Sequence, residues 1–279
     1  MPPKRVANPP VPTRPHDTSE SVDMPEPPKP VPRRTTPKPR PEVHTPNPNN
    51  EEHSILNNPI LIQPTVHQIM PVKTNYELMD WQGSPFSYPN MIRIYTIADG
   101  SCFFHALMNA TNKVYRSERS NGYALPRADI VRNLRKALAY RLGDPVDPRG
   151  DPFDNHYNRL GGGALRMLSR TAPQYGILEM QARLRNPNQQ VGNEYNEFVS
   201  DQLGIDIYIL DGTTRDVYMT GDDWGRLYKD RDSVVLLYMP GHYELVGLLT
   251  DRMTEVTLFK PENQFIQSIR ARMVELCHE

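Results

Sequence analysis

Cys102 is the residue best suited to nucleophilic chemistry, because it follows a short turn and opens a predicted helix. It is one of two cysteines among 279 residues. The first N–H groups of a helix have no intrahelical partner and lie at the positive end of its dipole, so they favour a thiolate over a thiol. With the N–H groups of Gly100 and Ser101 they could bind an oxyanion, and Gly100 is expected to adopt a positive φ. The alternative is a small buried residue without chemistry.

A nucleophilic cysteine needs a base, and His242 is the best placed of the eight histidines. It stands at the head of a predicted strand, just after a Pro-Gly turn. Strand side chains alternate, so Glu244 faces the same side and can accept the imidazole N–H. His105 lies on the thiol's own helix, which favours a packing or surface role. Cys102 and His105 would supply only two of the four ligands of a structural zinc site, so no metal is predicted.

The N-terminal part of the chain differs in composition from the rest. Of the 29 prolines, 18 fall within residues 1–64, and we predict a disordered Pro-rich tail there, locally polyproline II. Its PxxP spacings beside basic residues could dock SH3 or WW modules or act as a nuclear signal, although a solvated spacer satisfies the same patterns. Residues 65–90 are interpreted as an arm packing on the domain, and residues 91–279 as the folded domain, which ends in a helix.

Bulk composition bears on partners and compartment. The formal net charge of −1 gives the whole chain no electrostatic footprint for nucleic acid. No apolar run is long enough to cross a membrane, and no secretory signal is visible. With only two cysteines, we expect free thiols and a reducing compartment, hence the cytoplasm.

The elements that must position these residues follow from hydrophobic periodicity. The sequence predicts a strand over 91–97 and then helices over 102–112, 125–142, 164–184 (interrupted near Pro173 and Gly176) and 193–204, with residues 143–163 as a loop. The period then changes to two, which predicts strands over 205–210, 215–220, 233–239, 242–249 and 254–259, followed by a helix over 261–276. This order indicates an α+β domain with helices packed on a mostly antiparallel sheet.

Three motifs in this order resemble those of the ovarian-tumour (OTU) superfamily of cysteine proteases, the deubiquitinases. Asp-Gly-Ser-Cys-Phe-Phe at residues 99–104 matches the first signature. Gly-His-Tyr-Glu at residues 241–244 matches the last, with Glu where the family usually has Asp or Asn. The middle signature is similar to VGNEYNEFVSDQLGIDIYIL, with Val191 in the place of Trp and with Gly192 and Glu197 retained. The resemblance covers about residues 91–250. The superfamily has members in large DNA viruses as well as in cells.

The resemblance implies an OTU-like fold and a role for each matched residue. Cys102 would be the nucleophile, His242 the general base and Glu244 the residue that orients His242. Asp99 and the backbone from Gly100 to Cys102 would form the oxyanion-hole segment, with the Asp99 side chain as a further candidate for the third catalytic residue. The implied substrate is ubiquitin, or a ubiquitin-like protein, joined through its C-terminal glycine to a lysine.

The implied reaction proceeds through a thioester and needs no cofactor. The setting would be the cytoplasm, that of the host for a viral member, with the nucleus as a further possibility. Two alternatives stay open: a non-catalytic module of the same fold that binds ubiquitin, and a protease for another ubiquitin-like modifier.

Overall fold

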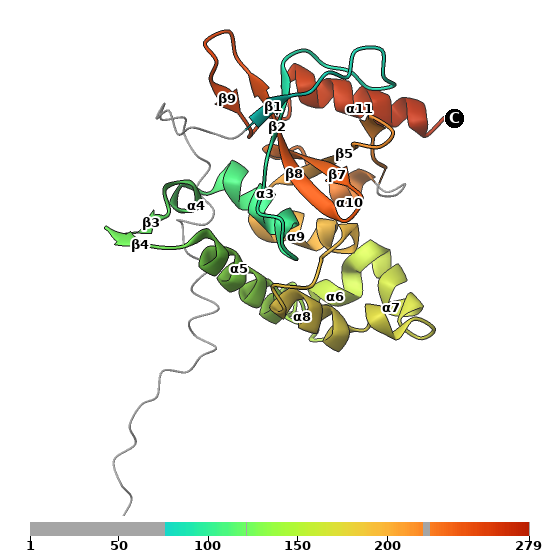
Figure 1. The fold of residues 1–279 in the computed structure, drawn as a ribbon. Coiled ribbons are helices and arrows are strands. Elements are labelled where there is room, and N and C mark those ends of the chain that lie inside the picture. The colour runs from blue at the N-terminus through green and yellow to red at the C-terminus, as the bar shows by residue number, and fades with distance from the viewer. Residues whose placement is uncertain (1–75, 121, 220–223, 279) are drawn as a thin grey trace, which may run out of the picture. The chain divides into compact units, whose positions relative to one another are not determined.

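A mixed sheet forms the centre of the fold, with strands in the order β1-β2-β8-β7-β5-β6 and with β9 paired to β8 (Figure 1). The computed structural model describes residues 76–120, 122–219 and 224–278, which all belong to one compact unit. The strands are β1 (Tyr76–Leu78), β2 (Met91–Ile94), β5 (Asp206–Asp211), β6 (Asp216–Val217), β7 (Ser233–Met239), β8 (His242–Leu249) and β9 (Glu255–Val256). Within the described sheet only β5 and β7 pair in parallel, which confirms the predicted α+β class with a mostly antiparallel sheet.

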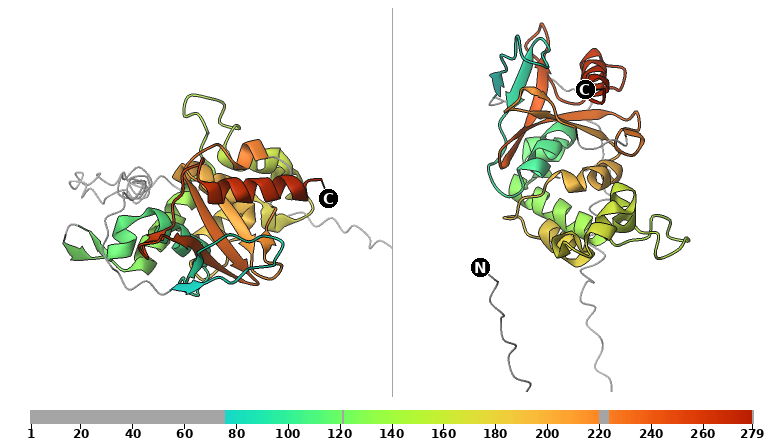
Figure 2. Two further views of the ribbon diagram at one scale, coloured as in Figure 1. Left: turned by 90° about the horizontal axis from the view of Figure 1, so that it is seen from above. Right: turned by 90° about the vertical axis from the view of Figure 1, so that its right-hand side faces the viewer.

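Side chains alternate between the two faces of the sheet, as the period of two predicts. Ile207 on β5 and Leu236 on β7 pack against the helices of one face, whereas Tyr208 and Leu237 pack against the helix of the other. The first face carries α3 (Cys102–Thr111), α5 (Arg127–Arg141), α8 (Ile177–Arg185) and α9 (Asn196–Leu203), and the second carries α11 (Gln264–Leu276). Figure 2 shows α11 on the opposite side of the sheet from these helices.

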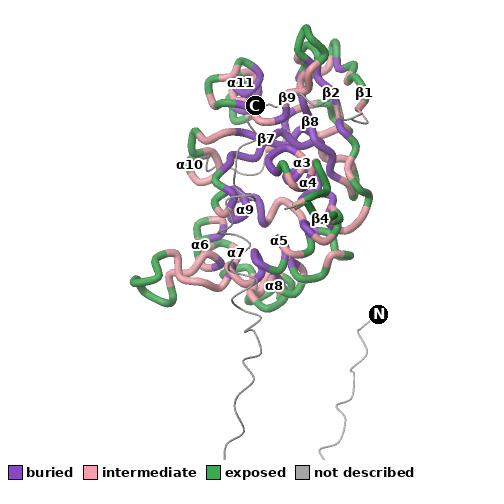
Figure 3. Tube along the Cα trace, turned by 90° about the vertical axis from the view of Figure 1, so that its left-hand side faces the viewer, coloured by how far each residue is buried: buried purple, intermediate pink, exposed green. Residues whose placement is uncertain are grey.

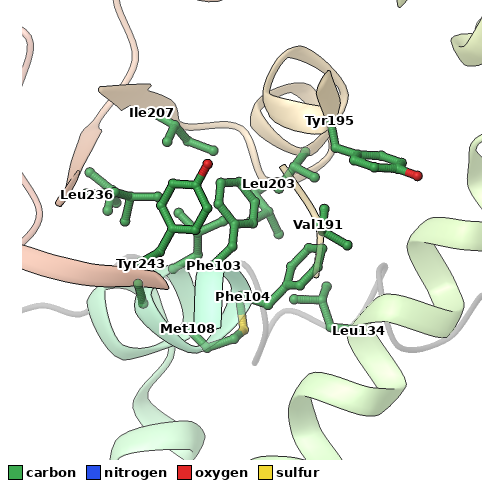
Figure 4. Close-up of a cluster of buried hydrophobic side chains, with 14 of the residues drawn as sticks. Phe103, Phe104, Met108, Leu134, Val191, Tyr195, Leu203, Ile207, Leu236 and Tyr243 are labelled. Atoms are coloured by element: carbon green, nitrogen blue, oxygen red, sulfur yellow. The ribbon is translucent and has the colours of Figure 1, made fainter. Parts of the chain in front are cut away.

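Helix α3 is the central helix of the fold and is buried on nearly all sides. Its aromatic side chains Phe103 and Phe104 have sheet residues on one side, Ile207 and Tyr243, and Leu134 of α5 on the other (Figure 4). The buried stretches in Figure 3 accordingly converge on α3, β7 and β8. A helix buried all round holds its first residue more firmly than a surface helix would, because neighbours on every side restrict its movement.

The predicted helices and strands are found, with some differences in extent. The strand predicted over 91–97 ends at Ile94, and those predicted over 215–220 and 254–259 shorten to β6 and β9. The remaining elements are α4 (Lys113–Ser117), β3 (Arg119–Ser120), β4 (Tyr123–Ala124), α6 (His156–Arg159), η1 (Leu160–Gly163), α7 (Ala164–Leu168), η2 (Pro173–Tyr175), η3 (Asn193–Tyr195) and α10 (Trp224–Leu227). The predicted loop 143–163 thus contains short helical turns. None of the helices in the described ranges has the length and apolarity needed to cross a bilayer.

The described part of the predicted arm, residues 76–90, lies on the domain. β1 extends the sheet by pairing with β2, and Trp81 and Phe86 are buried in the cluster beneath α11. Phe86 and Phe265 bring their ring centroids to 6.3 Å. Residues 65–75 and the predicted tail over 1–64, with its SH3 and WW candidate segments, lie outside the described residues.

Candidate active site

The turn that precedes α3 is built by the side chain of Asp99. Its Oδ1 accepts the N–H of Ser101 at 2.7 Å, and its Oδ2 lies 3.2 Å from Nε2 of His105. His105 is fully buried, and its Nδ1 lies 2.9 Å from the hydroxyl of Tyr115. Of the two roles predicted for His105, packing is therefore right and surface exposure is wrong. Because Asp99 already holds the Ser101 N–H, this N–H is engaged within the turn.

Gly100 is required by a close approach of two backbone segments, and not by a positive φ. Its φ lies outside the left-handed region, so the predicted conformation is wrong. A Cβ at this position would lie 2.3 Å from the carbonyl carbon of Asn188 and 2.6 Å from the nitrogen of Gln189. Only glycine lets the loop after α8 pack this closely on the turn.

The thiol of Cys102 lies at the open edge of β8. In the described sheet, the pairing of β2 with β8 stops at Leu245, which leaves the backbone of Tyr243 without a strand partner on that side. Its N–H donates to Sγ of Cys102 at 3.3 Å, and its carbonyl accepts the Thr96 hydroxyl at 2.6 Å. The first residue of α3 is therefore brought to the head of β8, where His242 immediately precedes Tyr243.

Burial favours the neutral form of the Cys102 thiol, contrary to the expectation for a cysteine at a helix N-terminus. Cys102 is 3% exposed, and burial raises its pKa above the ordinary value. The backbone N–H groups of Tyr243, Phe103 and Cys102 itself oppose this shift, whereas the charge of Asp99 adds to it. Burial wins because it removes the water that would stabilise the charged form. Any nucleophilic role of this thiol therefore needs a base to take its proton.

His242 and Glu244 share one face of β8, as the strand period predicted. Nε2 of His242 lies 3.6 Å from Oε1 of Glu244, and the Glu244 side chain is 5% exposed. Burial raises the pKa of Glu244, and the positive charges of Arg93 and His242 oppose this shift. Arg93 on β2 places its Nε 3.0 Å from Oε2 of Glu244 and 3.5 Å from a carboxylate oxygen of Glu77. The buried carboxylate is thus held between an imidazole and a guanidinium.

A cavity of about 230 Å³ opens beside the thiol. Its walls include Cys102, the segment 190–193, Gly241 in the β7–β8 turn, and three tyrosines, Tyr218, Tyr238 and Tyr243. The side-chain amide of Gln190 donates to the carbonyl of Gly241 at 2.6 Å, which joins the two rims of the cavity. Val191 and Gly192 of the predicted middle motif therefore lie beside Cys102. Glu197 lies apart from it, accepting the N–H of Gly161 at 3.0 Å.

Two arginines of the site were missed in the sequence. Arg93 pairs with Glu244 across β2 and β8, a contact that needs the strand register. Arg135 on α5 donates to the Gly100 carbonyl and the Ser101 hydroxyl at 2.7 Å each. A signal for Arg135 was present, because it lies four residues after the buried Val131 and hence on an apolar face of its helix. Among the residues that the structure describes, no three His, Cys, Asp or Glu side chains gather as metal ligands would.

No protein-family model and no curated protein matches this sequence. Among solved structures, the chain is similar to an ovarian tumour (OTU) domain in complex with ubiquitin, with 14% identity over 67% of this chain and 85% of that chain and a TM-score of 0.37. It is also similar to an OTU deubiquitinase from Wolbachia pipientis wMel (10% identity, 57% and 90% covered, TM-score 0.31) and to the viral OTU domain protease from Farallon virus (13% identity, 63% and 97% covered, TM-score 0.29). These likenesses are remote.

Proposed function

We propose that the chain is a cysteine-dependent deubiquitinase, which hydrolyses the isopeptide bond after the C-terminal glycine of ubiquitin. The observation that carries the proposal is the 3.3 Å hydrogen bond from the Tyr243 N–H to the Cys102 thiol. It brings the only buried cysteine of the described residues to the strand head that bears His242 and its carboxylate partner Glu244. Support for ubiquitin as the acyl group comes from the three OTU-like motifs in the sequence.

In the proposed reaction, His242 takes the proton of the Cys102 thiol. Its Nε2 faces Glu244, so in this proposal Nδ1 is the ring nitrogen that accepts the thiol proton. The sulfur attacks the glycine carbonyl, and the oxyanion is stabilised by the backbone N–H of Cys102 at the start of α3. Each such donor contributes about 10²–10³ in rate. The C–N bond then breaks as His242 returns the proton to the departing lysine amine, and water hydrolyses the thioester.

Glu244 and Asp99 have different roles in this proposal. Glu244, with its Oε1 3.6 Å from Nε2 of His242, orients the ring and stabilises the imidazolium by its charge, which is the task of the third residue in such a set. The carboxylate of Asp99 is committed to the Ser101 N–H and to His105, so Asp99 shapes the turn that presents the thiol. The Ser101 N–H is held by Asp99 at 2.7 Å, whereas the Cys102 N–H makes only a long bond of 3.4 Å to the Asp99 carbonyl, so the Cys102 N–H is the one proposed to turn to the oxyanion.

The burial of Cys102 favours one alternative, a module that binds ubiquitin without cleaving it. A thiol that is 3% exposed, with a raised pKa, is what a non-catalytic packing residue would show. The cavity beside the thiol and the ion pair of Glu244 with Arg93 support the enzyme instead, because packing alone requires neither.

Hydrolysis of a panel of di-ubiquitins separates these functions. Wild-type protein is expected to release mono-ubiquitin, whereas Cys102→Ala and His242→Ala are expected to bind the dimers without cutting them. Binding without cleavage by the wild type would identify the non-catalytic module. Cleavage of substrates built on another ubiquitin-like modifier, with none for ubiquitin, would assign a protease for that modifier.

A further inference from the structure

Arg135 is a buried arginine that no catalytic role described above uses. It lies on α5 and is 1% exposed. Its guanidinium donates to Gly100 O and Ser101 Oγ at 2.7 Å, Arg183 O and Asn186 O at 2.6 Å, Gln189 O at 2.8 Å, Leu184 O at 2.9 Å and Pro187 O at 3.5 Å. These oxygens belong to two chain segments, the turn before the thiol and the end of α8 with its following loop.

The acceptors that Arg135 contacts are carbonyl and hydroxyl oxygens, without a carboxylate among them. A buried cation is costly unless it is well hydrogen-bonded, and here the carbonyls at the end of α8 and the nearby negative charge of Asp99 offset that cost. Arg183 and Leu184 stand in the last turn of that helix, where carbonyls lack intrahelical partners and the dipole end is negative. Burial lowers the pKa of Arg135 to about 10, so it remains charged at neutral pH.

The two segments that Arg135 joins lead into two walls of the cavity, which are formed by Cys102 and by residues 190–193. The turn at residues 99–101 leads into Cys102, and the loop at residues 186–189 leads into the cavity-lining segment 190–193. The two segments also touch directly, since Ser101 donates its hydroxyl to the Pro187 carbonyl at 2.9 Å and Gly100 packs on Asn188. The guanidinium is a planar fork, so it fixes both segments in direction as well as in distance.

We propose that Arg135 is a positioning residue that holds the nucleophile turn and the 186–193 segment at a fixed separation, and thereby sets the width of the cavity beside Cys102. It touches neither the reacting atoms nor the acyl group. Its effect on the reaction rests on the proposed function, whereas its effect on the two walls does not.

Arg135→Lys tests this role, because lysine keeps the positive charge and lacks the planar guanidinium that donates to both segments. Amide hydrogen exchange is expected to rise in residues 100–102 and 186–193 together. Covalent labelling by ubiquitin bearing a C-terminal electrophile is expected to fall about 10- to 100-fold, as for reacting groups displaced by about 1 Å. Labelling of Cys102 by iodoacetamide needs no aligned acyl group and is expected to stay the same or rise. All rates are taken at a temperature where circular dichroism shows the variant folded.

A matched control is Arg231→Lys. Arg231 also bridges polar groups, Asp206, Asp201 and Ser200, at a distance from the cavity lining. The Arg231→Lys variant is expected to have a lower unfolding midpoint. Its amide hydrogen exchange in residues 100–102 and 186–193, and its ratio of ubiquitin-probe to iodoacetamide labelling, are expected to equal those of the wild type. The same change in both variants would show a general loss of stability and would overturn the proposal.

Ser101→Ala keeps the test decisive if Arg135→Lys does not fold. It retains the guanidinium and removes the hydroxyl that links Arg135 to Pro187. Smaller increases in amide hydrogen exchange are expected in residues 100–102 and 186–193. Exchange rates equal to those of the wild type in both stretches would overturn the proposal. Wild-type protein that the ubiquitin probe fails to label would refute the proposed function instead, while hydrogen exchange would still decide the role of Arg135.

Discussion

Replacing Arg93 by leucine is expected to shift the acid limb of the pH–activity profile towards higher pH. Arg93 lies 3.0 Å from the buried Glu244 carboxylate and lowers its pKa against the effect of burial. Without this charge, Glu244 stays protonated up to a higher pH. A protonated Glu244 cannot support the His242 imidazolium, so activity is expected to fall on the acid side of the profile and to be retained on the alkaline side.

The size of this shift follows from the geometry. Unit charges about 4 Å apart interact by about 4 kcal/mol at an effective dielectric constant of about 20, and a neighbouring opposite charge moves a carboxyl pKa by about 1–3 units. The Arg93 side chain is 27% exposed, so water screens part of this interaction and we take the lower end. The expected shift is about one pH unit, which corresponds to about 1.4 kcal/mol.

The assay is kcat/KM against pH for a fluorogenic ubiquitin amide, with circular dichroism at each pH to show that the variants are folded. Arg93→Lys retains the charge and is expected to stay near the wild-type profile. Glu77→Gln is expected to move the acid limb the other way, because the Glu77 charge raises the pKa of Glu244. An Arg93→Leu profile that superimposes on the wild type, or an equal shift in Arg93→Lys, would refute the role given to this ion pair.

Three further predictions concern the thiol and its walls. Iodoacetamide is expected to alkylate the exposed Cys277 before the buried Cys102 in native protein at pH 7, as measured by peptide mass spectrometry. Equal alkylation rates for the two cysteines would contradict the burial of the Cys102 thiol and its raised pKa. Gly100→Ala is expected to lower the free energy of unfolding in urea by about 1–3 kcal/mol, because its Cβ would lie 2.3 Å from a backbone carbon of Asn188. An unchanged midpoint with an unchanged slope would rule out that close approach. Gln190→Ala is expected to speed alkylation of Cys102, because it removes the amide bridge across the cavity rims, and a wild-type rate would show that the bridge does not limit access.

Local patterns in the sequence were sufficient to predict much of the fold. The turn before Cys102 and the start of α3 follow from Asp-Gly-Ser and the apolar spacing after it. The alternation along β8 placed His242 and Glu244 on one face, and Gly204 ends α9 with a φ of 66°, as expected for a helix C-cap. Each of these features is set by neighbours within a few residues, which is why the sequence alone reveals them.

Features that depend on distant contacts could not be predicted. The raised pKa of Cys102 follows from how completely β8 and the core cover the thiol, which a helix N-terminus does not indicate. The pairing of Arg93 with Glu244 depends on the register of β2 against β8. Turn geometry favours a positive φ at Gly100, whereas the packing of Asn188, 88 positions later in the chain, is what excludes a side chain there.

Intact-mass spectrometry after incubation with ubiquitin bearing a C-terminal electrophile tests most directly whether Cys102 attacks the ubiquitin terminus with the help of His242. The wild type is expected to gain the mass of one ubiquitin, with the adduct mapped to Cys102. His242→Ala is expected to react far more slowly, and Cys102→Ala not at all. A folded wild-type protein that gains no mass, or an adduct that persists in Cys102→Ala, would contradict this account.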